Sequence, residues 1–565
     1  MSEWIKGVDY PEWGDENYLT TLKGGYLQPN ESPKQAYRRI TSAAMQHLSK
    51  VPVENLEERI FEILWNGWLI PSTPVMANMG TKSALPIACF GSVVDDSISS
   101  IWEKAAEIAM MSKLGGGTSL NVSKIRPVGS PIRNGIGGFS DGLMPFLKVF
   151  DATISASKQS LVRRGAIAVY LDIEHKEAKD FLKVVKQSSG ENHCSHIQTA
   201  FVISDSFMDS LETNPENKKF FKEVIKMRVE RGFPYLMWKD TANKNKPFDW
   251  NTNIEIGASN LCVEVQLCSD SQHSFVCCLS SMNVGRFDEW RNTDAVFIAA
   301  LFLDAVMEEF IQNAKGIKEL ECAVRFATKS RALGLGVLGL ASYFQSKEIE
   351  YGGLLSQSMS RIIFGQIQNE TIVASKFMGL HLGVPEWAEG SGRRNITLTC
   401  IPPTRSTSLL AGNMSEGCQP YVGNVFANQT AKGTFYQVVP EFEKYLKSID
   451  MYSEEVLKSV GDAKGSCQHL NFIPDEIKRI FKTRFEINQK SLVQLTGVIQ
   501  TYIEQGISCN LSFRSDAPPK YIYETHIEAW KQGLKSLYYL KSESLIEIDK
   551  INKEELYANC SACEG

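Results

Sequence analysis

Short β-like runs alternate with amphipathic stretches from about residue 71 to residue 540. Residues 166–173 (AIAVYLDI) form one such run and are followed by the amphipathic stretch 176–186. Residues 395–401 (NITLTCI) form another, with an amphipathic stretch from Leu409 onward. This alternation is typical of parallel strands joined by helical crossovers. The sequence therefore predicts an α/β fold with much parallel sheet.

The two ends of the chain differ from this central part. Residues 1–70 show helical periodicity, for example over 33–48 and 53–69, which predicts a small helical domain. Residues 541–565 are acidic, hold few large apolar side chains and end in Cys560-Ser-Ala-Cys563-Glu-Gly. Such a segment is typical of a mobile tail. The predicted parts are a helical domain (1–70), an α/β domain (71–540) and a flexible tail (541–565).

Charge and hydropathy exclude several classes of protein. The 60 basic and 65 acidic side chains give a net charge of −5, which offers no electrostatic footprint for nucleic acid or an anionic membrane. The longest apolar run near the middle, 295–303, falls short of the roughly 20 residues that span a bilayer. The N-terminus has no apolar signal region, so we expect a cytoplasmic location. The 13 cysteines, an odd number, are then expected to remain thiols.

A polar face is predicted in the segment 259–265 (SNLCVEV). In an extended strand or loop, residues two apart point the same way, so Asn260, Cys262 and Glu264 share one face. A structural cysteine behaves as a small hydrophobe and would be expected on the apolar face instead. We therefore predict a chemical role for Cys262. A half-exposed strand with a polar face is the alternative.

Further cysteines lie in β-like segments elsewhere in the chain. Two thiols that meet in space can deliver two electrons and two protons by closing a disulfide. Cys89 and Cys277 are candidates for such a pair. Buried, inert thiols are expected at Cys194, Cys268, Cys322, Cys400, Cys467 and Cys509.

Several motifs together resemble the catalytic large subunit of class I ribonucleotide reductases. They span about residues 16–565 in the family's order and are Asn260-Leu-Cys-Val-Glu264, Pro71-Ser-Thr-Pro74 before Cys89, Gly115-Gly-Gly117, Arg126-Pro-Val-Gly-Ser-Pro-Ile-Arg133, Tyr538-Tyr539 and the C-terminal cysteine pair. The resemblance implies a ten-stranded α/β barrel made of two parallel five-stranded halves. It also implies reduction of ribonucleotides, expected to be diphosphates, to 2′-deoxyribonucleotides.

The resemblance assigns roles to the residues of the polar face. A thiyl radical at Cys262, on a loop threaded through the barrel, abstracts the 3′ hydrogen of the substrate. Glu264 takes the 3′-OH proton as general base, and Asn260 orients the sugar. Cys89 and Cys277 protonate and expel the 2′-OH and finish as a disulfide. The family's Cys-x-Leu pattern favours Cys277 over its neighbour Cys278, which is interpreted as structural.

Four more residues are assigned to electron transfer by the same resemblance. Tyr538 and Tyr539 match adjacent tyrosines that pass an electron and a proton between a small subunit and the thiol. Two aromatic residues in a core strand are the alternative. Cys560 and Cys563, which supply only two of the four ligands of a structural zinc site, match a pair that reduces the active-site disulfide. No metal site is expected on this chain.

Two nucleotide sites are implied. The substrate site comprises Ser72, Thr73, Ala88, Pro403, Thr404, Arg405, Ser406 and Thr407, with an ordinary helix N-cap as the alternative for residues 403–408. Arg405, and the pair Cys418-Gln419, depart from the family's usual residues. The allosteric specificity site, for a deoxynucleoside triphosphate or ATP, comprises Asp96, Ser97, Ile98, Arg126, Ile132 and Arg133. Residues 157–165 would relay the effector's identity, with a basic surface loop as the alternative.

Partners and cofactors follow from the same resemblance. The expected partners are a ferritin-like small subunit whose metal cofactor supplies the radical, thioredoxin or glutaredoxin, and a second copy of the chain in a homodimer. Apart from nucleotide effectors, no bound cofactor is expected. Only some 16 residues precede the family core, so we expect no ATP cone and no shut-off by dATP through it.

Three alternatives to this function share part of these features. An adenosylcobalamin-dependent reductase shares the barrel and the terminal cysteines but usually lacks the tyrosine pair. An inactive, nucleotide-sensing paralogue would lack the catalytic positions that this chain retains. A dehydrogenase would rest on Gly334-x-Gly336-x-x-Gly339, but the preceding residues 320–332 have a helical pattern, whereas a dinucleotide fingerprint follows a strand. We interpret that motif as a close-packed barrel segment.

Overall fold

The computed structural model describes residues 4–82, 84–157, 165–184, 194–430 and 433–543. Most of the predicted tail (541–565), with Cys560 and Cys563, lies outside the described residues, as does most of segment 157–165. Within the described ranges, no helix is long and apolar enough to cross a membrane.

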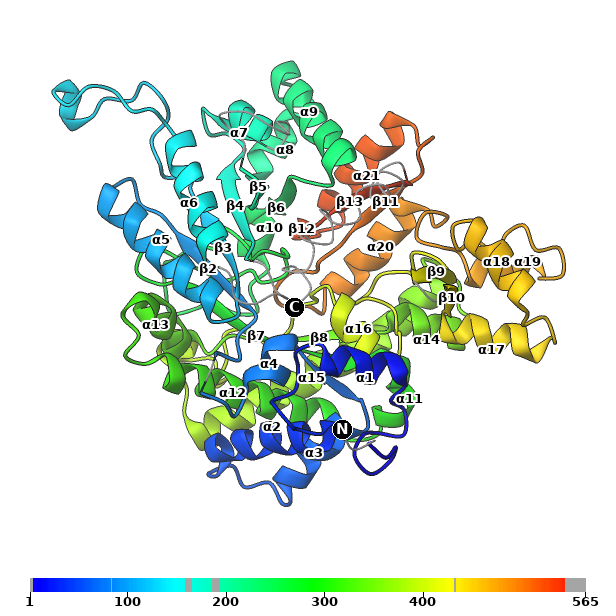
Figure 1. Cartoon of the computed structure of the whole chain (residues 1–565). Coiled ribbons are helices and arrows are strands. Elements are labelled where there is room, and N and C mark those ends of the chain that lie inside the picture. Colours follow the sequence, from blue (N-terminus) through cyan, green and yellow to red (C-terminus); the bar gives the residue numbers. More distant parts are fainter. Residues whose placement is uncertain (1–3, 83, 158–164, 185–193, 431–432, 544–565) are drawn as a thin grey trace.

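The N-terminal helices are α1 (Glu16–Lys23), α2 (Pro33–Leu48) and α3 (Leu56–Trp65), which lie together at one end of the molecule (Figure 1). Ser32 caps α2 in a capping box, which fixes its start where the sequence predicts it. The helical prediction over 53–69 is wrong at its end. Gly67 adopts φ +65°, and Leu69–Pro71 forms strand β1 instead.

The first half of the barrel is a run of five parallel strands in chain order. They are β2 (Cys89–Val93), β3 (Gly117–Asn121), β4 (Ile167–Asp172), β5 (Ile197–Ile203) and β6 (Tyr235–Trp238). The connecting helices include α5 (Ile98–Lys113), α6 (Met144–Ala156), α7 (Ala178–Val184), α8 (Asp205–Ser210) and α9 (Pro215–Arg231) (Figure 1). The strands are buried almost throughout, as expected of parallel strands covered by helices.

The second half also contains five parallel segments. Strand β7 (Phe275–Asn283) pairs with β8 (Leu333–Leu338), and single bridges join β8 to the segment around Thr399 and Ile401 to Ile507. That last segment continues into β11 (Leu511–Phe513), which pairs with β13 (Leu540–Ser542) just after β12 (Ser536–Leu537).

Two antiparallel seams join the halves. Strand β7 pairs with β2, and β12 pairs with β6, so the ten segments form a closed ring. The predicted ten-stranded barrel of two parallel halves is therefore confirmed, as is the N-terminal helical part.

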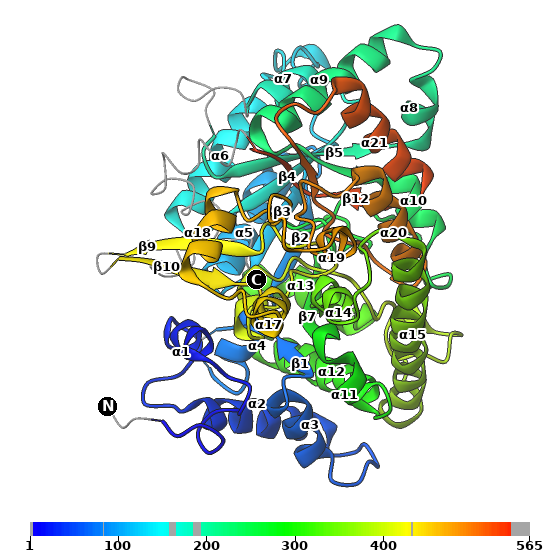
Figure 2. The same cartoon turned by 90° about the vertical axis from the view of Figure 1, so that its right-hand side faces the viewer.

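The remaining elements cover the barrel or extend from it (Figure 2). Long helix α15 (Leu354–Leu382) runs along the side away from the hairpin of β9 (Val425–Thr430) and β10 (Gly433–Val438). That hairpin packs with α17 (Pro440–Ser448) and α18 (Glu454–Asp462) around its own apolar cluster, which includes Phe442, Val460 and Phe481. The sequence did not predict this appended unit.

The other helices are α4 (Thr73–Asn78), α10 (Lys239–Lys244), α11 (Phe287–Trp290), α12 (Ala295–Ala314), α13 (Glu321–Ser330), α14 (Leu340–Ser346), α16 (Arg405–Leu410), α19 (Asp475–Ile480), α20 (Gln489–Gln500) and α21 (Pro519–Lys531). Short 3₁₀ turns are formed by Arg133–Gly135, Val284–Arg286, Lys318–Leu320 and Glu386–Ala388.

The glycines of the motif 334–339 are packing residues. Gly334 and Gly336 lie within β8 rather than after a strand. A Cβ on Gly334 would stand 2.6 Å from the sulfur of Cys400, and one on Gly336 would stand 2.7 Å from the Cys400 carbonyl oxygen. The glycines therefore let β8 pack closely against residues 397–401, as the barrel interpretation expects, and the motif does not form a dinucleotide turn.

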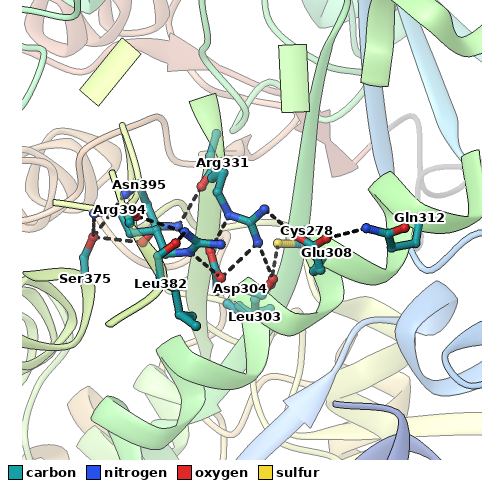
Figure 3. Close-up of polar contacts among 12 residues, drawn as sticks. Cys278, Leu303, Asp304, Glu308, Gln312, Arg331, Ser375, Leu382, Arg394 and Asn395 are labelled. Carbon is teal, nitrogen blue, oxygen red and sulfur yellow. Dashed lines mark hydrogen bonds and ion pairs between the residues drawn. The ribbon is translucent and has the colours of Figure 1, made fainter. Parts of the chain in front are cut away.

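A buried ionic network fixes the outer wall of the second half (Figure 3). Asp304 of α12 accepts hydrogen bonds from Arg331 at 2.9 and 3.0 Å, from Arg394 at 2.8 Å and from Asn395 at 2.9 Å. Burial alone would raise the pKa of Asp304, but the two guanidinium groups lower it to about 2. Asp304 thus ties α12 to both β8 and the segment 395–401.

Replacement of Asp304 by alanine is expected to destabilise the protein by about 3–5 kcal/mol, because two buried guanidinium groups would lose their counter-charge. Urea unfolding measures this effect. As a control, Asp516→Ala removes one partner of an exposed ion pair with Arg514 and should change the stability by no more than about 0.5 kcal/mol. Equal stability of the two variants would contradict the structural role of Asp304.

Candidate active site

The segment 259–265 forms a tight loop, which is the second of the two conformations that the sequence allows and the one that the family resemblance implies. Val263 adopts φ +66°, and the Val263 N–H donates to the Asn260 carbonyl at 3.3 Å. The loop lies between the two halves of the barrel, because Tyr170 of β4 donates to the Asn260 carbonyl at 2.6 Å while Ser508 from the opposite half donates to the Cys262 carbonyl at 2.6 Å. All three predicted residues of the polar face are buried.

Asn260 brings the loop and β2 together. Its Nδ2 donates to Glu264 Oε1 at 2.8 Å and to the Cys89 sulfur at 3.0 Å. The thiol of Cys89 in turn lies 3.7 Å from Glu264 Oε1, to which it donates. Three of the predicted residues therefore share one hydrogen-bonded cluster, although a turn and not strand alternation gathers them.

The carboxyl group of Glu264 is suited to proton exchange near neutral pH. It is 1% exposed, and burial raises its pKa, while hydrogen bonds from Asn260, Ser508 and Cys89 lower it; the outcome is a pKa of about 7. A general base works best when its pKa lies near the working pH. The environment of Glu264 thus fits such a role.

Cys89 and Cys277 face each other across the antiparallel seam. They are directly opposite in the register of β2 and β7, so their side chains leave the same face of the sheet. Opposed residues of antiparallel strands have Cα atoms about 4.5–5.5 Å apart, within the roughly 4.4–6.8 Å that a disulfide requires. The pair predicted from the sequence can therefore close a disulfide without movement of the strands.

The two adjacent cysteines of β7 point in opposite directions. The Cys278 thiol donates to the carbonyl of Leu303 on α12, at 3.2 Å, outside the barrel (Figure 3). Cys277 points inward, where the amide of Gln505 lies 3.7 Å from its sulfur. The interpretation of Cys278 as structural thus agrees with its position.

A further thiol, Cys400, contacts the sulfur of Cys277. The sulfurs of Cys400 and Cys277 lie 2.6 and 2.8 Å from the point where a Cβ of Gly334 would stand, so the missing side chain opens the space between them. From the sequence, Cys400 is expected to be a buried, inert thiol. However, Cys400 and Cys277 stand on segments two strands apart, about 9.5 Å between their backbones, beyond the roughly 7 Å limit for a disulfide.

The tyrosine pair connects Cys262 to the edge of the barrel. The hydroxyl of Tyr538, which is buried, donates to the Cys262 sulfur at 3.6 Å. Half-buried Tyr539 lies next to it, with ring centroids 4.3 Å apart. The ring of Tyr235 on β6 contacts both, at 4.8 and 5.1 Å. One hydroxyl of the pair thus reaches the Cys262 thiol.

Two parts of the predicted substrate site lie close together. Residues 403 and 404 lead into α16, which begins at Arg405 and contacts β1, the strand that leads into Ser72. Ser72 is buried and its hydroxyl has no hydrogen-bond partner among the described residues. Thr73 pairs with Tyr26 at 3.0 Å. Ala88 is buried next to Cys89, while Pro403 and Ser406 are half-buried and Arg405 is exposed.

The hydroxyl groups of Thr404 and Thr407 make hydrogen bonds to nearby backbone groups. Thr404 precedes α16 but makes no side-chain cap to it; its Oγ1 instead accepts from the Gly417 N–H at 2.7 Å. Thr407 donates to the Thr404 carbonyl at 3.2 Å. The simple N-cap interpretation is therefore not what the structure shows.

The predicted effector residues lie beyond the other end of β2. The side chain of Arg126 donates to Asp96 at 2.7 Å, and Ser97 caps α5 by accepting from the Ser100 N–H at 3.2 Å. Ile98 is exposed, and Ile132 and Arg133 follow Arg126 in a surface loop. The structure thus brings Asp96 and Arg126 together directly.

Residues 505–510 line the site but were missed from the sequence. Gln505 contacts Cys277, Ser508 contacts Glu264 at 3.0 Å, and Tyr170 holds the loop from β4. In the sequence, these positions are visible only as single polar residues within apolar runs. Such a pattern does not indicate which residue, far away along the chain, each of them contacts. Within the described ranges, no cluster of three or more histidine, cysteine or acidic side chains could hold a metal.

Both parts of the chain match known protein families. Residues 13–84 match the family "Ribonucleotide reductase, all-alpha domain", and residues 87–220, 214–391 and 383–540 match "Ribonucleotide reductase, barrel domain". A ribonucleoside-diphosphate reductase large subunit from Invertebrate iridescent virus 3 is 30% identical, covering 97% of this chain and 98% of that protein. A putative ribonucleoside-diphosphate reductase large subunit from Frog virus 3 is 31% identical, covering 90% of this chain and 93% of that protein.

A solved structure resembles the chain closely. The alpha subunit of the Actinobacillus ureae class Id ribonucleotide reductase is 36% identical and superposes with a TM-score of 0.87, covering 94% of this chain and 98% of that one.

Mild oxidation with diamide is expected to link Cys89 to Cys277, because only that pair has disulfide geometry across the seam. Peptide mass spectrometry after alkylation identifies the linked cysteines. Cys278→Ser should leave this linkage intact, and Cys277→Ser should remove it. A linkage of Cys278 to Cys89 would show that the register of the seam is wrong, and a linkage of Cys277 to Cys400 would contradict the assignment of Cys89 as the partner of Cys277.

Proposed function

This chain belongs to the family of ribonucleotide reductase large subunits, and from that premise we propose that the thiol site inside its barrel reduces ribonucleoside diphosphates to 2′-deoxyribonucleotides. The protein is an oxidoreductase of this family. One observation carries the proposal: Tyr538, Cys262, Glu264 and the Cys89–Cys277 pair converge inside a single closed barrel. The proposed parts are a helical domain (1–70), a catalytic barrel (71–540) and a redox tail (541–565).

Radical formation at Cys262 is the first proposed step. An electron and a proton leave the Cys262 thiol through Tyr538 and Tyr539 toward a ferritin-like small subunit, whose metal cofactor supplies the radical. The 3.6 Å contact between the Tyr538 hydroxyl and the Cys262 sulfur supports this route. The resulting thiyl radical abstracts the 3′ hydrogen of the substrate, in a buried loop from which water is excluded.

Proton transfer from the substrate is the second step. Glu264, ionised, accepts the 3′-OH proton, and Asn260 orients the sugar through its amide. The pKa of about 7 for Glu264 supports this assignment, since the group can both take and release a proton near neutral pH.

Two-electron reduction completes the reaction. Cys89 and Cys277 protonate the 2′-OH, which leaves as water, and their sulfurs join in a disulfide that supplies the two electrons. Cys262 then returns a hydrogen atom to C3′. The balance is one ribonucleotide and two thiols consumed, and one deoxyribonucleotide, one water and one disulfide formed. Cys560 and Cys563 in the tail, themselves reduced by thioredoxin or glutaredoxin, would restore the thiols.

Nucleotide binding is proposed at the two sites predicted from the sequence. Substrate phosphates would bind at residues 403–408 and Ser72, whose buried, unpartnered hydroxyl supports this. Deoxynucleoside triphosphates or ATP would bind at residues 96–98, Arg126, Ile132 and Arg133 in a homodimer and select the substrate base. No other cofactor is proposed on this chain.

The experiment that tests this function is CDP reduction by the chain with a candidate small subunit and dithiothreitol. Wild type should form dCDP. Cys262→Ser should lose turnover by at least about a thousandfold, because the hydroxyl cannot carry the radical, while still binding CDP and unfolding like wild type. Cys322→Ser, on the outer helix α13, serves as the matched control and should retain activity.

Two outcomes would overturn the proposal. Dependence of dCDP formation on adenosylcobalamin in place of the small subunit would favour the cobalamin class. Nucleotide binding without any dCDP formation, by wild type with its small subunit, would favour a nucleotide-sensing paralogue.

A further inference from the structure

The segment 505–510 contacts several parts of the site from one strand. The peptide N–H of Tyr538 donates to the Cys509 carbonyl at 2.8 Å, so this segment sets the position of the tyrosine pair. The neighbouring Ser508 points into the barrel and is 4% exposed. Residues 508 and 509 therefore contact both the loop that carries Cys262 and the backbone of the tyrosine pair.

Ser508 bridges the loop and the carboxylate. Its hydroxyl oxygen lies 2.6 Å from the Cys262 carbonyl oxygen and 3.0 Å from Glu264 Oε2, and it can donate to either. The other carboxylate oxygen, Oε1, accepts from Asn260 and Cys89. Oε2 thus shares the single hydroxyl hydrogen of Ser508 with the Cys262 carbonyl oxygen, on the side of the carboxylate that faces the opposite half of the barrel.

We propose that Ser508 is a positioning residue that holds Glu264 ionised and correctly oriented to accept the substrate proton, and that it ties this carboxylate to the loop tip bearing Cys262. The inference rests on the proposed function for the identity of the proton donor. A hydrogen bond from a neutral donor stabilises a buried carboxylate more than the protonated acid, because the charged oxygen is the stronger acceptor.

The groups around Glu264 make this donor important. Burial raises the pKa of Tyr170 and of Cys400 well above their ordinary values, so both stay neutral at physiological pH. The titratable and charge-bearing groups that face Glu264 are Cys262 on its own loop, Cys89 on β2, Tyr170 on β4 and Cys400 on the segment 397–401. Since none of these is a cation, hydrogen bonds carry the stabilisation of the charged carboxylate.

The test is the pH dependence of turnover in Ser508→Ala. Wild-type kcat should rise with pH through a midpoint near 7, because the base acts when ionised. Loss of the Ser508 donor should raise that midpoint by about one unit. At pH 7 the variant should therefore be about fivefold slower, and it should recover nearly full activity at pH 9.

Three variants separate this effect from a structural one. Ser508→Thr keeps the hydroxyl and should keep the wild-type profile. Ser508→Cys, of similar size but with a weaker donor, should shift the midpoint in the same direction as alanine. Ser512→Ala removes a buried serine further along the same strand and should leave the midpoint unchanged.

A second readout does not need turnover. The carboxyl C=O stretch of Glu264, identified by its loss in Glu264→Gln, can be titrated by infrared difference spectroscopy in wild type and Ser508→Ala. A higher midpoint in the variant supports the inference even if ribonucleotide reduction is not found. Equal midpoints in folded wild type, Ser508→Ala and Ser508→Cys would overturn it, whether or not the enzyme reduces ribonucleotides.

Discussion

The antiparallel seam between β2 and β7 holds the candidate active site together. It is one of the two places where the parallel halves of the barrel meet, and its register sets Cys89 opposite Cys277. A slip of one residue would turn one of the two thiols to the outer face, where Cys278 now lies. Closure of the ring and disulfide chemistry therefore depend on the same strand pairing.

Closure of the barrel also explains the electrostatics of the site. The loop at 259–265 is enclosed by strands from both halves, and none of the described groups that face the desolvated Glu264 is a cation. A carboxylate in such surroundings depends on neutral donors, and Asn260, Cys89 and Ser508 each supply one. The same enclosure would keep a thiyl radical at Cys262 away from water.

Much of the fold and the site could be predicted from the sequence, for different reasons. Alternation of apolar runs and amphipathic stretches is a local signal, and it predicted the α/β class correctly. The family motifs predicted the barrel and the residues that the structure brings together around Cys262. Register is not local, so spacing alone could not show that Cys277 faces Cys89 or that Ser508, far along the chain, contacts Glu264. The resemblance implied a loop here, but the positive φ at Val263 could not be predicted, because alternation alone is equally compatible with a strand.

Activity of Tyr538→Phe with a cognate small subunit tests the central claim most directly, because phenylalanine preserves the ring packing but removes the hydroxyl that lies 3.6 Å from the Cys262 sulfur. CDP reduction should fall to background while the variant folds and binds nucleotides like wild type. Reduction at the wild-type rate would contradict a radical route through this contact, and with it the account of how the barrel, the loop and the tyrosine pair work together.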